Sequence, residues 1–123
     1  MKNILLVATG GAFGSVARYL FQVWTPKFYS GNFPLSTFIV NVIGCFLIGV
    51  FFAMSDKVGA LNPQQRLLLM TGICGGFTTF SAFAFESTQL LNSGKYYTLG
   101  IYALGSVIIG IIAVYLGIAI VKT

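Results

Sequence analysis

Four long apolar stretches separated by short turns limit what this chain can fold into more than any other feature. They cover residues 4–24, 35–54, 67–91 and 99–121, and each has about the 20 residues that an α-helix needs to cross a bilayer. Only 7% of the residues are charged, whereas a soluble domain carries about a quarter. The sequence therefore predicts an all-α membrane protein in which residues 1–123 form a single domain of four membrane-spanning helices.

Turns rich in glycine and proline join the stretches. Short connections make neighbouring helices antiparallel, so an even number of spans places both chain ends on the same side of the membrane. Asn62 and Pro63 predict the start of the third helix, with Asn62 as its cap and Pro63 in its first position. Glycines recur four or five residues apart within the spans, which predicts helices that pack backbone to backbone.

The net charge of +5 raises the question of a nucleic-acid partner, but the basic residues stand singly and form no patch. We therefore expect membrane lipid around the protein and no nucleic acid. Four basic residues fall on the side of the chain ends, against three on the other side if Arg18 extends outward. The four are Lys2, Lys57, Arg66 and Lys122. So small a difference in basic residues hardly favours one membrane orientation by the positive-inside rule. This hints at insertion in both orientations.

The third stretch contains "GGFTTFSAF", residues 75–83, a run of glycines and hydroxyls where lipid should be. Gly72, Gly75 and Gly76 weaken a helix, so we expect the third span to be broken near its middle. Backbone groups freed inside a membrane need protein, water or an ion as a partner, and broken helices commonly bind ions. Two interpretations stay open: a backbone ion site, or a kink healed by the threonine hydroxyls.

Aromatic and hydroxyl side chains follow the predicted break. Phe77, Phe80 and Phe83 recur at steps of three and would share one face of a helix, with Ser81 on a neighbouring face. Such a stripe is typical of simple packing, but the positive edge of a phenyl ring also favours an anion without any formal charge. The sequence leaves both interpretations open.

Polar residues also occur in the second and fourth spans. Thr37 and Asn41 lie on one stripe of the second span, where Asn41 is the one strongly polar residue. Buried polar groups in membranes are costly and often functional, although a hydrogen bond between helices would equally explain Asn41. Tyr102 and Ser106 lie four residues apart on one face of the fourth span. They either add hydroxyls to a polar path or bind the helices together.

Arg18 and Glu86 are the only charges well inside the spans. Arg18 is expected to anchor at the interface or to face an aqueous mouth, and Glu86 to face a vestibule. The chain has no histidine, no acidic pair and no serine with an activating base, so we do not expect an enzyme. Cys45 and Cys74 lie in apolar stretches, and we interpret both as small packing residues, with a disulfide or redox role as the alternative.

Three motifs in chain order resemble one known family. "GGAFGSVARY", "NVIGCFLIG" and "GICGGFTTFSAF" are similar to segments of the fluoride exporter or channel family called Fluc or CrcB. The resemblance covers the full chain length, and its third motif is highly specific. It implies a fluoride-selective channel that exports fluoride passively across the bacterial inner membrane. It also implies an antiparallel, dual-topology homodimer with two pores at the interface and a central sodium ion.

The resemblance assigns roles along the ion path. Asn41 would be the pore asparagine that donates to fluoride. Phe80 and Phe83 would turn the edges of their rings toward the ion. Thr37 and Ser81 would supply hydroxyls along the path.

The resemblance also implies a metal site and one departure from the family. The backbone carbonyls of Gly75 and Thr78 would hold the sodium ion, and Arg18 matches the arginine of the first motif. The family commonly reads "TTFSTF", whereas this chain has Ala82 in place of the second hydroxyl. The hydroxyl track is therefore expected to be shorter, which slows conduction or makes it depend more on Ser81.

Two other classes fit the four-span layout. Small multidrug transporters are also dual-topology dimers, but they need a membrane-embedded acid in the first span, and this span contains Arg18 and no acid. A non-transporting assembly subunit would explain the glycines and the apolar content. It would not explain Asn41 together with a hydroxyl-rich break.

Overall fold

The computed structural model describes residues 1–122, apart from the side chains of Lys57 and Val58. That part of the chain is helical and contains no strand. The prediction of four candidate membrane-spanning helices is confirmed, and each predicted stretch falls within one of them. The predicted charge balance counts Lys57, whose side chain lies outside the described residues. The four spans are Lys2–Lys27, Leu35–Asp56, Pro63–Asn92 and Tyr96–Lys122.

Three of the spans are long helices, and the third is assembled from shorter segments. The long helices are α1 (Lys2–Trp24), α2 (Leu35–Ala53) and α6 (Tyr96–Lys122). Short 3₁₀- and π-helical turns, η1 (Thr25–Lys27) and η2 (Met54–Val58), extend α1 and α2. The third span consists of α3 (Pro63–Arg66), the π-helical segment η3 (Leu67–Cys74), α4 (Gly75–Phe77) and α5 (Phe80–Asn92).

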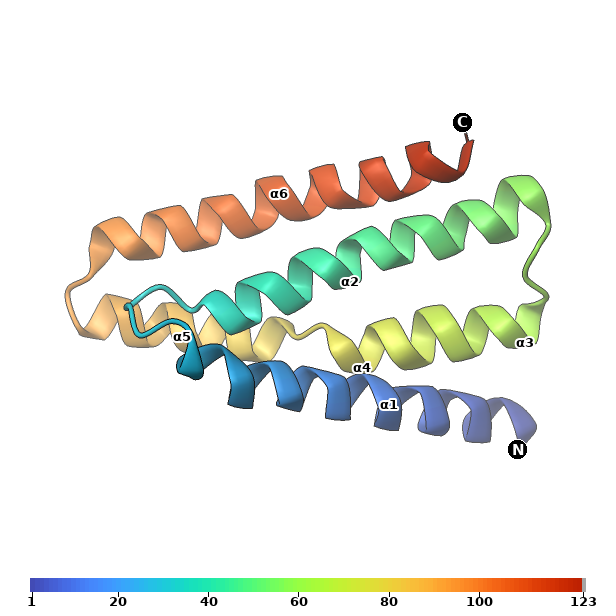
Figure 1. The fold of residues 1–123 in the computed structure, drawn as a ribbon, viewed down its shortest axis with the longest axis horizontal. Coiled ribbons are helices and arrows are strands. Elements are labelled where there is room, and N and C mark those ends of the chain that lie inside the picture. The colour runs from blue at the N-terminus through green and yellow to red at the C-terminus, as the bar shows by residue number, and fades with distance from the viewer. Residues whose placement is uncertain (123) are drawn as a thin grey trace.

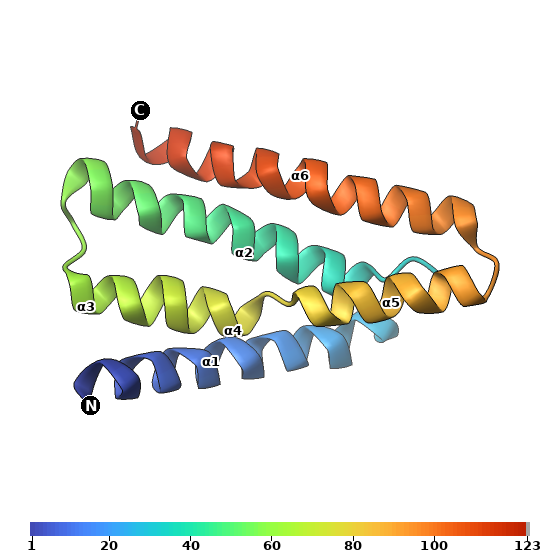
Figure 2. The ribbon, with the colours of Figure 1, turned by 180° about the vertical axis from the view of Figure 1, so that it is seen from behind.

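The spans lie side by side, with α2 between α6 and the third span, and with α1 on the other side of the third span (Figures 1 and 2). The main packing pairs are α2 with α6, and α1 with η3 and α4. Both ends of the chain lie at the same end of the bundle (Figure 1), as the even number of spans predicts.

Glycines bring the helix backbones together, as predicted. A Cβ atom placed on Gly10 of α1 would lie 2.9 Å from the Cα atom of Gly72 in η3. A Cβ atom on Gly49 of α2 or on Gly117 of α6 would collide with a backbone carbonyl of the facing helix. Dispersion contacts between backbones therefore hold these pairs, as is usual where lipid provides no hydrophobic driving force.

The start of the third span follows the predicted signal. The Gln65 N–H donates to Asn62 Oδ1 at 2.8 Å, and the Asn62 N–H donates to Gln65 Oε1 at 3.0 Å. This reciprocal pair is a capping box, with Pro63 in the first helical position. The predicted helix start is confirmed.

The predicted break in the third span is confirmed, but it lies at threonines and not at glycines. Thr78 and Thr79 are extended, with ψ of 157° and 120°, while Gly75 still has helical dihedrals. Gly76 is also helical, and a Cβ atom there would lie 2.5 Å from the Gly11 carbonyl oxygen of α1. The glycines therefore serve packing against α1, and the β-branched threonines, which favour extended backbone, form the break.

Candidate functional site

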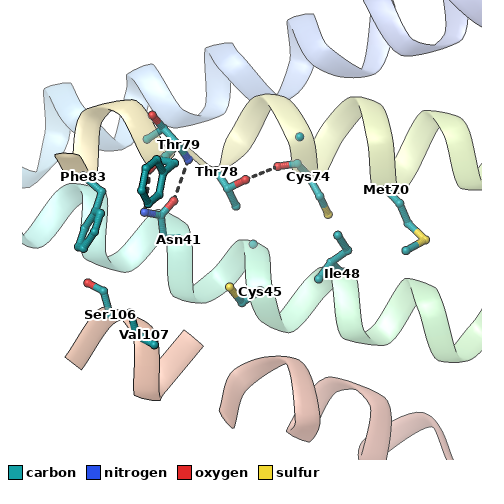
Figure 3. A pocket seen from close by; sticks show the side chains of 13 residues that line it. Asn41, Cys45, Ile48, Met70, Cys74, Thr78, Thr79, Phe83, Ser106 and Val107 are labelled. Carbon is teal, nitrogen blue, oxygen red and sulfur yellow. Dashed lines mark hydrogen bonds between the residues drawn. The ribbon is translucent and has the colours of Figure 1, made fainter. Parts of the chain in front are cut away.

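The break is held open by the side chain of Asn41 in α2. The Thr79 N–H donates to Asn41 Oδ1 at 2.8 Å, and Asn41 Nδ2 donates to the Thr79 carbonyl at 3.1 Å (Figure 3). The amide thus satisfies both backbone groups of one extended residue, which would otherwise be costly in a membrane. An amide nitrogen carries two N–H donors, so Asn41 is an interhelical link that still has one donor beyond these two bonds.

The extended threonines separate several carbonyls from their usual helical donors, and those of Gly75 and Thr78 are among them. In a continuous helix the Thr79 N–H would donate to the Gly75 carbonyl, and here it donates to Asn41 instead. The Ala82 N–H would donate to the Thr78 carbonyl, and here it donates to Thr79 Oγ1 at 3.1 Å. The two carbonyls predicted to hold a cation are therefore among those whose helical donors are diverted.

Two other carbonyls just before the break, those of Cys74 at the end of η3 and Gly76 in α4, have protein partners. Arg18 Nε donates to the Gly76 carbonyl at 3.1 Å. The Cys74 carbonyl accepts from the Thr78 N–H at 3.0 Å and from Thr78 Oγ1 at 2.9 Å. Arg18 therefore links α1 to the break, a contact that its position near a span end did not reveal.

A cavity of about 350 Å³ opens beside the break, between α2, the third span and α6 (Figure 3). The Ser106 hydroxyl is buried there without a hydrogen-bond partner among the described residues. A buried hydroxyl in this condition is uncommon in proteins, and it leaves a donor free for a ligand. Six residues predicted for the pore or the metal line this cavity: Asn41, Gly75, Thr78, Phe80, Phe83 and Ser106.

The prediction that three phenylalanines share one face is wrong. Phe77 is buried against α1, where its ring meets Phe21 edge-on with centroids 5.8 Å apart. Phe80 and Phe83 lie beyond the break, with their centroids 5.8 Å apart, and both line the cavity. The extended threonines interrupt the helical period, so only the two later rings stay together.

Glu86 of α5 joins residues from two neighbouring helices, α2 and α6. Thr37 Oγ1 of α2 donates to one carboxylate oxygen at 2.8 Å, and the Tyr102 hydroxyl of α6 donates to the other at 2.9 Å. Both donors are buried, with Tyr102 fully inaccessible and Thr37 1% exposed. The Tyr102 ring also packs 5.0 Å from the Phe83 ring, which connects this network to the cavity.

A second cavity of about 320 Å³ lies on the outer side of Glu86. The loop between α1 and α2 and the end of α5 line it, and Lys95 stands at its edge. Glu86 therefore lies between an outer cavity and the hydroxyls of Thr37 and Tyr102. Helical spacing could not reveal this arrangement, because its three residues come from three different spans.

Ser81 lies apart from the inner cavity. Its side chain is exposed, and its hydroxyl lies 3.3 Å from that of Thr79. Among the described residues no group of three histidine, cysteine, aspartate or glutamate side chains could hold a metal ion.

Comparison with known proteins identifies the relatives of this chain. The family model described as CrcB-like protein, Camphor Resistance (CrcB), matches residues 5–118. A fluoride-specific ion channel FluC from Phocaeicola vulgatus is 49% identical over 118 residues, which is 96% of this chain and 97% of the relative. FluC proteins from Flavobacterium psychrophilum and Leptospira interrogans are 43% and 44% identical, covering 99% and 98% of this chain and 98% and 95% of the relatives.

These matches confirm the resemblance seen in the three motifs. The relatives bear the name of an ion channel and not of an enzyme. Together with the four apolar helices, they indicate a multi-pass membrane protein.

Proposed function

Because this chain belongs to the CrcB family, we propose that it is a fluoride-selective channel that exports fluoride passively across the bacterial inner membrane. The observation that carries the proposal is the cavity beside the helix break, which hydrogen-bond donors and two phenylalanines line without a basic side chain. Passive export is possible because the inside-negative membrane potential drives anions outward.

The lining of the cavity suits fluoride. Fluoride is small, strongly hydrated and only accepts hydrogen bonds, so a pore must replace its water with donors, as selectivity filters do. Asn41 has one further N–H, the Ser106 hydroxyl has no partner among the described residues, and Phe80 and Phe83 offer positive ring edges. These donors are weaker than a lysine or arginine, which would hold the ion too tightly for conduction.

The outer part of the proposed path runs past Glu86. Thr37 and Tyr102 donate their hydroxyls to this carboxylate, with Glu86 at the vestibule. Each hydroxyl has one hydrogen, so it would turn from Glu86 to donate to a passing ion. Ser81 and Arg18 keep the roles that the resemblance implies, as a path hydroxyl and a vestibule residue. Ala82 shortens the hydroxyl track beside them.

A second copy of the chain would complete the pore. Phe80 is 78% exposed although it lines the cavity, so one protomer leaves this wall open. We propose an antiparallel, dual-topology homodimer with two pores at the interface. The aromatic anchors support it: Trp24, Phe28, Tyr96 and Tyr97 lie exposed at one end of the bundle, while residues 1–8, 55–66 and 117–122 contain no aromatic residue. An antiparallel pair would give each membrane surface one aromatic belt.

The residues at the break fit a sodium ion at the dimer centre. Unwound carbonyls at helix ends are typical sodium ligands in membrane proteins, and the Gly75 and Thr78 carbonyls are released from their helical donors. Two protomers would together contribute these carbonyls from both sides. A bound cation there would raise the local potential for an anion.

The test is fluoride efflux from liposomes that contain the purified protein, measured with a fluoride electrode. Rapid release of fluoride but not of chloride is expected, with loss of release in Asn41→Asp and Phe80→Ile. Asn41→Asp replaces an N–H donor by an anion, and Phe80→Ile removes a ring edge. No release from a well-folded dimer would contradict the channel and favour a non-transporting assembly subunit.

A further inference from the structure

Gly44 of α2 lies directly against the break in the third span. A Cβ atom added at Gly44 would collide with the Cγ2 methyl group of Thr78, and it would lie 3.5 Å from the ring of Phe77. The glycine is itself buried. The methyl group of Thr78 therefore occupies the space that the absent side chain of Gly44 leaves.

This contact differs from the other tight glycine contacts within the helices. At those positions an added Cβ atom would come within 3.0 Å of backbone atoms, and they are Gly10, Gly14, Gly49, Gly72, Gly76 and Gly117. Such glycines let two backbones approach each other. Gly44 instead makes room for one side-chain methyl group, which belongs to the residue where the third span becomes extended.

The rest of the Thr78 residue is held by the preceding turn. Its N–H and its Oγ1 both donate to the Cys74 carbonyl, at 3.0 Å and 2.9 Å (Figure 3). With the hydroxyl fixed on one side and the methyl group against Gly44 on the other, the χ1 angle of Thr78 is defined. A β-branched side chain is stiff at χ1 and restricts its own backbone, so these contacts also set the direction of the Thr78 carbonyl.

Asn41, three residues before Gly44 in α2, holds the next residue of the break. It bonds both backbone groups of Thr79. Helix α2 thus holds Thr78 through its side chain and Thr79 through its backbone. The peptide group between them, which carries the Thr78 carbonyl, is fixed at both ends.

We propose that Gly44 is a positioning residue that fixes the direction of the Thr78 carbonyl at the break. Groups that orient a ligand without touching the metal ion commonly change metal affinity about 10- to 100-fold when they are mutated. The consequence for sodium rests on the proposed function, whereas the effect of Gly44 on the Thr78 carbonyl does not.

The deciding experiment observes this peptide group by NMR in the full-length protein. Thr78 and Thr79 are the only adjacent threonines in the chain, so threonine labelled with ¹³C at its carbonyl and ¹⁵N at its amide gives a single carbonyl–nitrogen signal. Gly44→Ala should shift this signal by more than its linewidth. Gly49→Ala is the matched control on the same helix: its Cβ atom would collide with the Val114 carbonyl of α6, and the signal should stay in place.

A methyl exchange tests the contact through sodium binding. Sodium that binds the folded state raises the melting temperature, with choline replacing it to keep the ionic strength constant. Gly44→Ala should need about 10- to 100-fold more sodium for the same stabilisation. Thr78→Ser removes the colliding methyl group and keeps the hydroxyl that donates to Cys74. Added to Gly44→Ala it should restore the wild-type sodium dependence, and added to Gly49→Ala it should restore nothing.

Several outcomes would overturn the proposal: an unshifted signal in Gly44→Ala, an equal shift in Gly49→Ala, or a sodium dependence that Thr78→Ser fails to restore. If Gly44→Ala does not fold alone, recovery of folding in the double variant supports the contact, and failure of the double variant contradicts it. If the signal shifts but sodium does not stabilise the wild type, the proposed sodium site fails and the positioning role of Gly44 stands.

Discussion

The two halves of the third span run in one direction but contact different neighbours. The first half, η3 and α4, packs against α1 through Gly72 and Gly76 and has no charged side chain. The second half, α5, packs mainly against α6, and its Glu86 is bonded to α2 and α6. The extended threonines between them let the two halves face different neighbours. A continuous helix would have kept the same faces toward the same neighbours along its length.

The comparison shows which half is held by contacts between backbones and which by contacts between side chains. In the first half Gly72 and Gly76 allow close backbone approach, so a side chain added at either is expected to be harmful. In the second half hydroxyls and a carboxylate form the contacts between helices. Single polar groups there should be replaceable at a smaller cost in stability, with the effect falling on conduction.

The largest effect is expected in the first half. Gly76→Leu places a side chain against the Gly11 backbone of α1, where neither helix can give way. We expect a loss of more than about 3 kcal/mol in the free energy of unfolding, because overpacking against backbone forces the helices apart. Thermal unfolding in detergent measures it. Gly100→Leu in α6, where nothing lies within 4 Å of an added Cβ, is the control and should stay folded.

The second effect concerns the carboxylate network of the second half. Tyr102→Phe keeps the ring packing on Phe83 but removes the hydroxyl that donates to Glu86. A hydrogen bond to a charged group contributes about 1.5–3 kcal/mol, so unfolding should become easier by about 2 kcal/mol. The same melting assay measures this change. A variant as stable as the wild type would mean that water replaces the hydroxyl at Glu86.

A smaller effect is expected at the junction of the two halves. Thr79 caps α5 by accepting from the Ala82 N–H, and a lost N-cap costs about 1 kcal/mol. Thr79→Ser keeps the cap hydroxyl and should recover most of the stability that Thr79→Ala loses. Equal stability of these two variants would show that the cap does not hold the break.

The smallest effect on stability should accompany a clear effect on conduction. Ser106→Ala removes a buried hydroxyl that has no partner among the described residues, so the fold should be unchanged. Efflux should fall by about fivefold to tenfold, which corresponds to one lost hydrogen bond to the ion. Ser87→Ala is the matched control, since its hydroxyl is equally buried and unpartnered but does not line the inner cavity. Equal efflux in both variants would show that Ser106 does not contribute to the fluoride path.

Much of the fold and part of the site could be predicted from the sequence. Span length, glycine spacing and the capping signal at Asn62 depend on local composition, so they predicted four helices, their close packing and the start of the third. Gly72, Gly75 and Gly76 predicted a break near the middle of the third span. The glycines were wrongly expected to form it, because their use in packing on α1 depends on a helix distant in the sequence.

The sequence by itself determined that this chain crosses a membrane, that its third span is interrupted, and which family it resembles. These properties follow from hydrophobicity and local motifs. Only the tertiary structure decided that Asn41 bonds both backbone groups of Thr79, that Arg18 binds the Gly76 carbonyl, and that two hydroxyls meet at Glu86. Each of these contacts joins different helices, and the relative rotation of packed helices is fixed by the whole set of interfaces and not by any one segment.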